Sequence, residues 1–304
     1  MISLSTSFRS REITDPEAFV EYLEKLDIQG VELEYRLTDR FFSGMKDPLL
    51  KSDLQVTSVH NYFPHPTSFE KLKPGGDLFL LSSPDQEERH RAVTWTARTI
   101  EVANDLEAAV VILHCGRVEM EPEIQKLHGF FKENRLISPD AQTFIGRKLD
   151  ELDGLKPEYL DSLLFSLDRL IRVAEKQGVV LGLENRVHYH ELPGCNDFEQ
   201  LFSEFAGGPV GYWHDTGHSH TAELLTIVSP GALLEKYAKN LVGLHFHDAI
   251  GLKDHLAPGT GESDFSAIKP FLRPDTLTVV ELKPGTTDED VKKGIDFMKS
   301  YLEE

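Results

Sequence analysis

The chain alternates short apolar runs with longer amphipathic segments, and this alternation restricts its fold more than any other feature. Eight runs are predicted as strands: residues 2–6, 30–34, 55–62, 109–115, 179–185, 210–215, 241–247 and 277–282. Helical patterns lie between them, as at residues 15–27, where Asp15 and Pro16 form an N-cap and first-turn pair. Another covers residues 157–178 and ends on Gly178. A strand–helix unit repeated eight times predicts an α/β fold, a parallel (β/α)8 barrel.

The main alternative is an open, doubly wound sheet. No G-x-G-x-x-G pattern follows any predicted strand, and that pattern is the usual companion of such a sheet. The barrel is therefore preferred. With 304 residues, 40% of them apolar, the chain is long enough to form a large core. Because no repeat, low-complexity stretch or linker divides it, we expect a single domain over residues 1–304.

Two connections are unusually long: residues 64–86 after the third strand and residues 117–156 after the fourth. Long excursions in compact domains are usually functional loops or small subdomains. In a barrel these two insertions rise at the end that carries the active site. A role in packing, or in contacts within a homo-oligomer, fits the sequence equally well.

Six of the predicted strands end on a side chain that can bind metal. Alternate residues of a strand face the same side, so one parity of each strand faces the barrel axis. On the parity that carries these ends, the preceding positions are mostly apolar or small, as with Val56 and Ser58 before His60. The six side chains are those of His60, His114, Glu184, Asp215, His245 and Glu281. We expect them to converge at the carboxyl end of the barrel, where barrel enzymes place their chemistry.

Such a cluster requires a cation. Buried carboxylates lose their hydration and repel one another, so their ionised forms are unfavourable unless something positive lies between them. A divalent ion resolves the conflict. Glu, Asp and His without thiolate ligands suit Mn²⁺, Zn²⁺, Co²⁺ or Mg²⁺. The sequence therefore predicts a divalent metal ion as the cofactor.

Further polar residues follow the predicted strands. Glu32 and Glu34 share the inward parity of the second strand and are candidates to reach substrate or to balance a nearby cation. Arg117 and Arg186 stand just after the mouth, where each can hold a phosphate or carboxylate or pair with an acidic neighbour. Asp248 is expected to orient a ligand histidine.

Composition restricts the partners and the compartment. A formal net charge of −19 disfavours nucleic acid, because nucleic-acid binding depends on Lys and Arg that displace counterions. No apolar run approaches the roughly 20 residues of a membrane helix, and the first residues lack the pattern of a signal peptide. The 2 cysteines can pair only once and are read as free thiols. We expect a cytoplasmic protein that binds neither membrane nor nucleic acid.

The strand ends resemble the xylose isomerase-like TIM barrel superfamily, which contains sugar isomerases, ketose 3-epimerases and abasic-site nucleases of the endonuclease IV type, AP endonuclease family 2. The motifs are LENR at 183–186, HDTGH at 214–218, LHFHD at 244–248, DHLAPGTGESDF at 254–265 and VVELKP at 279–284. The resemblance covers nearly the whole chain in strand order and is strongest from Glu184 to Glu281.

The resemblance implies a metal site and a set of acid–base residues. The shared metal ligands are Glu184, Asp215, His245 and Glu281. In the epimerases the two glutamates also act as acid and base on opposite faces of the substrate, which implies that role for Glu184 and Glu281 here.

The resemblance also indicates where further zinc ions bind in the nuclease branch. His60, His114 and His255 match those positions, but Lys253 stands where the nuclease pattern has an aspartate. Because a lysine repels a cation, we expect one divalent ion per chain. The candidates for contact with substrate are His60, His114, His218, His255, His190 and Arg186.

This chemistry suits a sugar. Proton removal beside a carbonyl is slow, and a metal that chelates the carbonyl and the adjacent hydroxyl stabilises the enediolate. Glu184 and Glu281 lie on different strands, which suits a base and an acid on opposite faces. We predict a divalent-metal-dependent sugar or sugar-phosphate isomerase or epimerase with a carbohydrate substrate. The alternatives are an endonuclease IV-like phosphodiesterase, a lyase or dehydratase on the same metal-enolate chemistry, and a non-catalytic sugar-binding barrel.

Overall fold

The protein is described by a computed structural model that covers residues 1–10, 12–69 and 71–303. Eight parallel strands close into a barrel, in which β1 pairs with both β2 and β10. The strands are β1 (Ile2–Ser5), β2 (Gly30–Leu33), β3 (Gln55–His60), β4 (Val110–Leu113), β5 (Val180–Glu184), β6 (Val210–Asp215), β7 (Leu241–Phe246) and β10 (Leu277–Val280). Each lies within its predicted range, and the (β/α)8 prediction is confirmed.

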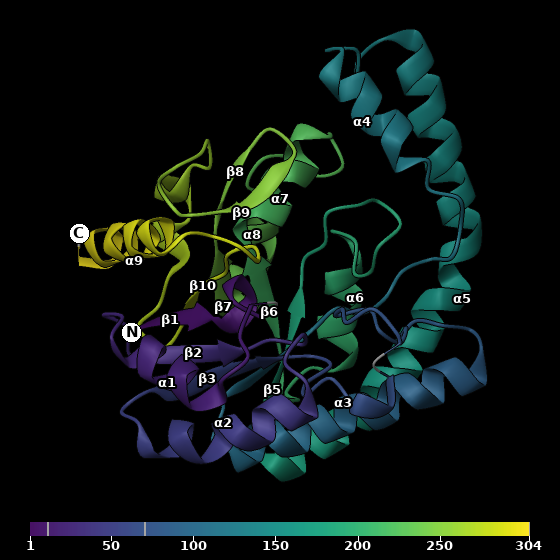
Figure 1. Cartoon of the computed structure of the whole chain (residues 1–304). Helices are drawn as coiled ribbons and strands as arrows, with labels where there is room; N and C mark the ends of the chain where they lie inside the picture. The colour runs from purple at the N-terminus through teal and green to yellow at the C-terminus, as the bar shows by residue number, and fades with distance from the viewer. Residues whose placement is uncertain (11, 70, 304) are drawn as a thin grey trace.

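Helices surround this barrel (Figure 1). They are α1 (Pro16–Glu24), α2 (Asp39–Lys51), α3 (Gln86–Asp105), α5 (Pro139–Gln177), α6 (Asp197–Glu204), α7 (Thr216–Leu224), α8 (Ala232–Tyr237) and α9 (Asp288–Glu303). Short 3-10 turns are η1 (Thr6–Phe8), η2 (Thr67–Phe69), η3 (Ala238–Asn240), η4 (Phe265–Ala267) and η5 (Lys269–Phe271). The predicted helix ends are present: the Asp15 carboxylate accepts two backbone N–H groups at the start of α1, and Gly178 ends α5 with φ 68°. Within the described ranges, none of these helices has the length and apolar content to cross a membrane.

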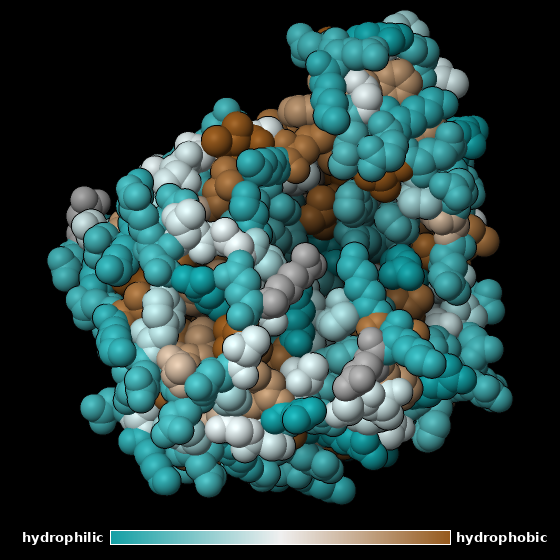
Figure 2. Space-filling view, in the orientation of Figure 1, coloured by the Kyte–Doolittle hydropathy of each residue, from teal (hydrophilic) through white to brown (hydrophobic). Residues whose placement is uncertain are grey.

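The connections after β3 and β4 are long, at the places where the sequence predicts insertions. The second holds α4 (Ile124–Lys132), and α5 is 39 residues long, so α4 and the first half of α5 project from the barrel as an arm. A separate apolar cluster ties this arm to the end of α7: Leu127, Phe130, Ala141, Phe144 and Leu225. The arm stands over a hollowed part of the surface (Figure 2).

A third excursion follows β7 and was not predicted. It contains the antiparallel pair β8 (Asp248–Ile250) and β9 (Lys253–Leu256). Asp248, expected to orient a ligand histidine, instead accepts hydrogen bonds from the backbone N–H groups of Gly261, at 2.7 Å, and Ser263, at 2.9 Å. It therefore holds the loop after β9 in place, and no histidine of the described residues hydrogen-bonds to its carboxylate.

The interior of the barrel is filled around Trp213. This fully buried side chain clusters with Val110, Ile112 and Val279, apart from the larger core between strands and helices. Two glycines on neighbouring strands make room for the indole, because a Cβ on Gly243 would lie 2.2 Å from Trp213 Cζ3 and one on Gly182 would lie 3.3 Å from Cε3. The inward parity read from the sequence is thus the parity that fills the barrel.

Gly243→Ala should destabilise the fold by about 1–3 kcal/mol, since the added methyl overlaps a side chain that has no room to move. The measurement is urea unfolding followed by fluorescence. Gly146→Ala is the matched control: Gly146 lies in α5, an added Cβ there meets open space, and the change should be neutral or stabilising by up to about 1 kcal/mol. Equal unfolding midpoints for Gly243→Ala and the unaltered protein would contradict this account of the interior.

Candidate active site

The side chains predicted at the strand ends lie together at the carboxyl end of the barrel. One ligand atom from each of Glu184, Asp215, His245 and Glu281 lies within 4.8 Å of the others, and all four residues are buried. His60 and His114 form a second group that shares Glu184. The strand periodicity explains the convergence, because each of these residues is the last inward position at the end of its strand.

His245 stands at the centre of the first group, and both of its ring nitrogens face carboxylates. Nδ1 lies 3.3 Å from Glu184 Oε1, 3.3 Å from Glu281 Oε2 and 3.5 Å from Asp215 Oδ2. Nε2 lies 3.1 and 3.2 Å from the two carboxylate oxygens of Glu32. A proton donated from Nε2 to Glu32 leaves the Nδ1 lone pair directed at the other three carboxylates, as in a metal site whose histidine is oriented by an outer carboxylate.

Glu32 is therefore the residue whose role the sequence did not assign. It is fully buried and also accepts a hydrogen bond from the Ser58 hydroxyl at 2.8 Å. In the sequence, its inward parity on β2 predicted only a contact with substrate or with a nearby cation. Its partner His245 lies 213 positions away in the chain, so the pairing required the closed barrel.

Two different hydrogen-bonding interactions hold the Asp215 carboxylate in place. It caps α7, where its carboxylate accepts the backbone N–H of His218 at 2.7 Å. It also lies 2.9 Å from His247 Nε2. His247 Nδ1 accepts the backbone N–H of His255 at 2.9 Å, so the ring proton of a neutral His247 is on Nε2 and is donated to Asp215. His247 thus orients a candidate ligand.

Glu184 has one oxygen in each group. Its Oε2 lies 2.8 Å from His114 Nε2 and 3.5 Å from His60 Nε2, yet neither contact is aligned as a hydrogen bond. Among the described residues this buried oxygen has no hydrogen-bond partner. His60 Nδ1 lies 2.9 Å from the Asn61 carbonyl oxygen, to which it donates, so the Nε2 lone pair of a neutral His60 faces Glu184.

Electrostatics keeps the carboxylates of this site ionised. Burial acts to raise the pKa of Glu184, but its contacts with His114, His245 and His60 outweigh burial and hold the pKa well below the usual value. Burial acts to lower the pKa of His245, and the charges of Glu281 and Glu32 reverse this and raise it well above the usual value. The site therefore favours positive charge between its carboxylates.

The remaining predicted contacts fall into two sets. His218 Nδ1 lies 3.1 Å from the Asn185 carbonyl oxygen and 3.4 Å from Glu184 Oε1. His255 has φ 55°, and its Nε2 lies 3.4 Å from Glu281 Oε2. Both rings thus reach the site. The His190 ring lies against those of His188 and Tyr189, and its contact with substrate stays a prediction.

Two basic residues that the sequence places near the site, Arg186 and Lys253, differ in position. Arg186 is buried, and its Nη1 lies 3.7 Å from Glu184 Oε2. Lys253, which the sequence places at a nuclease ligand position, is exposed on β9. The carboxylate beside His255 is instead Asp254, whose Oδ1 lies 3.1 Å from His255 Nδ1. Burial acts to raise the pKa of Asp254, but His255 outweighs it and lowers the pKa to about 2.

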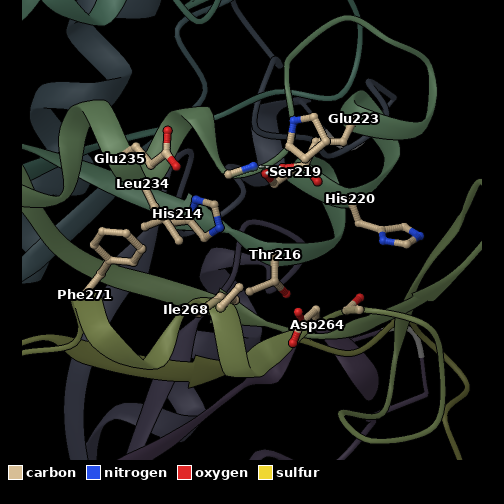
Figure 3. A pocket seen from close by; sticks show the side chains of 14 residues that line it. His214, Thr216, Ser219, His220, Glu223, Leu234, Glu235, Asp264, Ile268 and Phe271 are labelled. Atoms are coloured by element: carbon tan, nitrogen blue, oxygen red, sulfur yellow. Dashed lines mark hydrogen bonds between the residues drawn. The ribbon is translucent and has the colours of Figure 1, made fainter.

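A separate cavity of about 270 Å³ lies outside the barrel, between β6, α7, α8 and the η4–η5 segment (Figure 3). His214 points into it from the helix-facing side of β6, as its parity predicts. Its Nδ1 lies 2.6 Å from the Tyr212 hydroxyl, and burial lowers its pKa to about 4. The lining contains none of the candidate metal ligands, so this cavity is distinct from the site at the mouth.

The chain is similar to the uncharacterized protein MJ1311 of Methanocaldococcus jannaschii, with 27% identity over 152 residues, 48% of this chain and 50% of that protein. The chain spans about half the length of the curated relatives it matches.

Two solved structures share the fold over almost the whole chain. A D-tagatose 3-epimerase-like protein has a TM-score of 0.68 at 20% identity, covering 99% of this chain and 97% of that one. The 3-keto-D-glucoside 4-epimerase YcjR of E. coli has a TM-score of 0.67 at 16% identity, covering 98% and 97%. The family model described as xylose isomerase-like TIM barrel matches residues 20–301. Because that match covers most of the sequence, the chain belongs to the xylose isomerase-like TIM barrel family.

Proposed function

We propose that the protein is a divalent-metal-dependent isomerase or epimerase that acts on a carbohydrate. The observation that carries the proposal is that two buried glutamates from different strands approach one histidine nitrogen: Glu184 Oε1 and Glu281 Oε2 each lie 3.3 Å from His245 Nδ1. Family membership and the epimerases among the similar structures support the same class of reaction.

The residues present fit a metal ion. Glu184, Asp215, His245 and Glu281 offer three carboxylates and one imidazole with its other nitrogen turned to Glu32. This donor set, without thiolate, suits Mn²⁺, Co²⁺, Zn²⁺ or Mg²⁺. When bound there, a divalent ion supplies Lewis-acid stabilisation of the negative charge that develops on the substrate oxygens.

The chain's own groups supply the proton transfer. Glu184 and Glu281 are separated around the mouth by β6 and β7, so they can approach a substrate carbon from different sides. One carboxylate, ionised as in the free site, removes the proton beside the carbonyl, and the other takes up a proton when substrate binds and returns it to the opposite face. His218 and His255 contact these glutamates and are positioned to hydrogen-bond with substrate hydroxyls.

A second candidate is the endonuclease IV-like phosphodiesterase, and one observation favours it. Besides the central four residues, the described part of the chain contains the groups His60–His114–Glu184 and Asp215–His247–His255–Glu281, each of which can hold an ion. Three observations weigh against it. The Arg186 guanidinium lies 3.7 Å from the oxygen that a second ion would need, His247 is engaged with Asp215, and the net charge of −19 opposes DNA binding. A lyase or dehydratase would use the same first proton removal and would differ in its product.

Metal analysis is the first test. The protein is loaded with metal, freed of excess ions and measured by elemental analysis, and we expect one divalent ion per chain. The positive charge of Arg186 repels a second ion at the group that contains His60 and His114. Duplex DNA with an abasic site should not be cut by the same preparation. Three ions per chain together with efficient incision would overturn the sugar proposal in favour of the nuclease.

Glu32→Gln should weaken metal binding by about 10–100-fold, since the amide removes the negative charge that orients His245 and increases its basicity. Competition with a chelator measures this affinity. Glu34→Gln is the matched control, a buried carboxylate on the same end of β2 that pairs with Arg36 at 2.7 Å, and it should leave the metal affinity nearly unchanged. Equal affinities for Glu32→Gln and the unaltered protein would show that Glu32 does not act through His245.

Glu184→Gln and Glu281→Gln test the acid–base roles. Each variant, saturated with metal, should lose turnover by about 10²–10⁴-fold, because an amide cannot accept the substrate proton. In deuterated solvent one of the two variants should still exchange the substrate proton without net conversion, which identifies the remaining base. Near-native turnover of both variants at full metal occupancy would show that the glutamates bind the metal but do not transfer the proton.

A further inference from the structure

A cavity of about 450 Å³ opens at the mouth of the barrel beside His114, and its size is within the range of small-molecule sites. Its walls come from loops that follow several strands, and Arg36, Lys73, Asp77 and Arg186 are among the residues that line it. His114 contacts Glu184, so the cavity adjoins the proposed acid–base site.

Arg186 is the unusual group in this wall. Its side chain is only 8% exposed, and Nε and Nη1 have no hydrogen-bond partner among the described residues. One hydrogen bond is present, from Nη2 to Glu191 Oε1 at 3.3 Å. A guanidinium carries five N–H donors in a planar fork, and leaving most of them buried without acceptors is costly.

The carboxylates nearby balance charge in this wall, but they leave Nε and Nη1 of Arg186 without a hydrogen bond among the described residues. Asp77 Oδ2 lies 3.7 Å from Arg186 Nη2, 3.9 Å from Arg117 Nη1 and 3.8 Å from His114 Nδ1, so one carboxylate is shared by three basic groups. Arg36 is paired with Glu34, and Lys73 is exposed at the rim. Arg36, Lys73 and Arg186 thus line one cavity in a chain with 51 acidic and 32 basic residues.

The loop that carries Lys73 and Asp77 is fitted closely to the site. Gly76 lies against the His114 ring, and a Cβ at this position would lie 2.4 Å from His114 Nδ1. A residue without a side chain therefore allows the backbone to approach the imidazole. Residues 73–77 form a wall of the active site on which Lys73 is the outer cation.

We propose that this cavity binds an oxyanion of the substrate, so that the sugar carries a phosphate monoester or a carboxylate. The inference rests on the isomerase or epimerase function proposed above and specifies its substrate class. A planar guanidinium with free donors matches either anion through paired charge-assisted hydrogen bonds, whereas a hydroxyl of a neutral sugar offers no such pair of charged acceptor oxygens.

The test uses the metal-loaded, full-length protein and matched substrates: ketoses, their phosphate esters and the corresponding keto sugar acids. We expect kcat/KM for a phosphorylated or acidic substrate to exceed that of its neutral counterpart at least about tenfold. Lys73→Met should lower it about tenfold or more, mainly through KM, and should affect neutral sugars little. Arg186→Gln should also lower it about tenfold or more, and should lower it more for the anionic substrate than for its neutral counterpart. Arg172→Gln, on the outer face of α5, where Arg172 is 70% exposed and pairs with Asp168, should behave as the unaltered protein.

Binding of inorganic phosphate and of acetate, measured by calorimetry, gives a readout independent of turnover. Weaker binding of phosphate in Lys73→Met supports a phosphate ester, and weaker binding of acetate supports a sugar acid. Because Lys73 is exposed, this variant remains informative if Arg186→Gln does not fold. Preference for neutral sugars, with anion binding unchanged in Lys73→Met, overturns the proposal and leaves the isomerase function standing. Loss of anion binding in Lys73→Met without conversion of any sugar supports the anion site and counts against the isomerase function instead.

Discussion

The site depends on the burial of four carboxylates around one imidazole. Glu32, Glu184, Asp215 and Glu281 all face His245, and each would be costly to ionise without a positive charge among them. The barrel forces this arrangement, since the four side chains are projected from different strands into one narrow mouth. The same constraint explains the surrounding hydrogen bonds, which fix the orientation of the carboxylates and leave their lone pairs directed inward.

Much of this was predictable from the sequence because two periodicities are visible in it. The alternation of strands and helices indicates the closed barrel, and the period of two within a strand separates His245 and Glu184, which face the axis, from Phe246 and Leu183, which face the helices. These rules place side chains on a face and at an end of the barrel. They need no knowledge of which strand lies opposite which.

The partners of these side chains were not predictable in the same way. Glu32 is the hydrogen-bond partner of His245, and His247 accepts a backbone N–H from the segment after β8. Both contacts depend on angles and loop paths that no periodicity encodes. The β8–β9 hairpin escaped prediction because its strands are short and largely polar, and Asp248 was assigned to a histidine when backbone amides were its partners. Local pattern identified the candidate ligands, and tertiary contacts determined what orients them.

Trp213 closes the interior of the barrel beneath the site. Its indole lies edge-on to the His245 ring, with centroids 5.1 Å apart, and packs with Val110, Ile112 and Val279 beneath the site. The site is therefore closed at its base by these apolar side chains and opens at the carboxyl end of the barrel. A molecule that binds there enters and leaves through the same opening, under the arm of α4 and α5 and beside the loop at residues 73–77. The residues on that rim consequently influence entry and exit together, and a change that admits a larger molecule also alters how that molecule leaves.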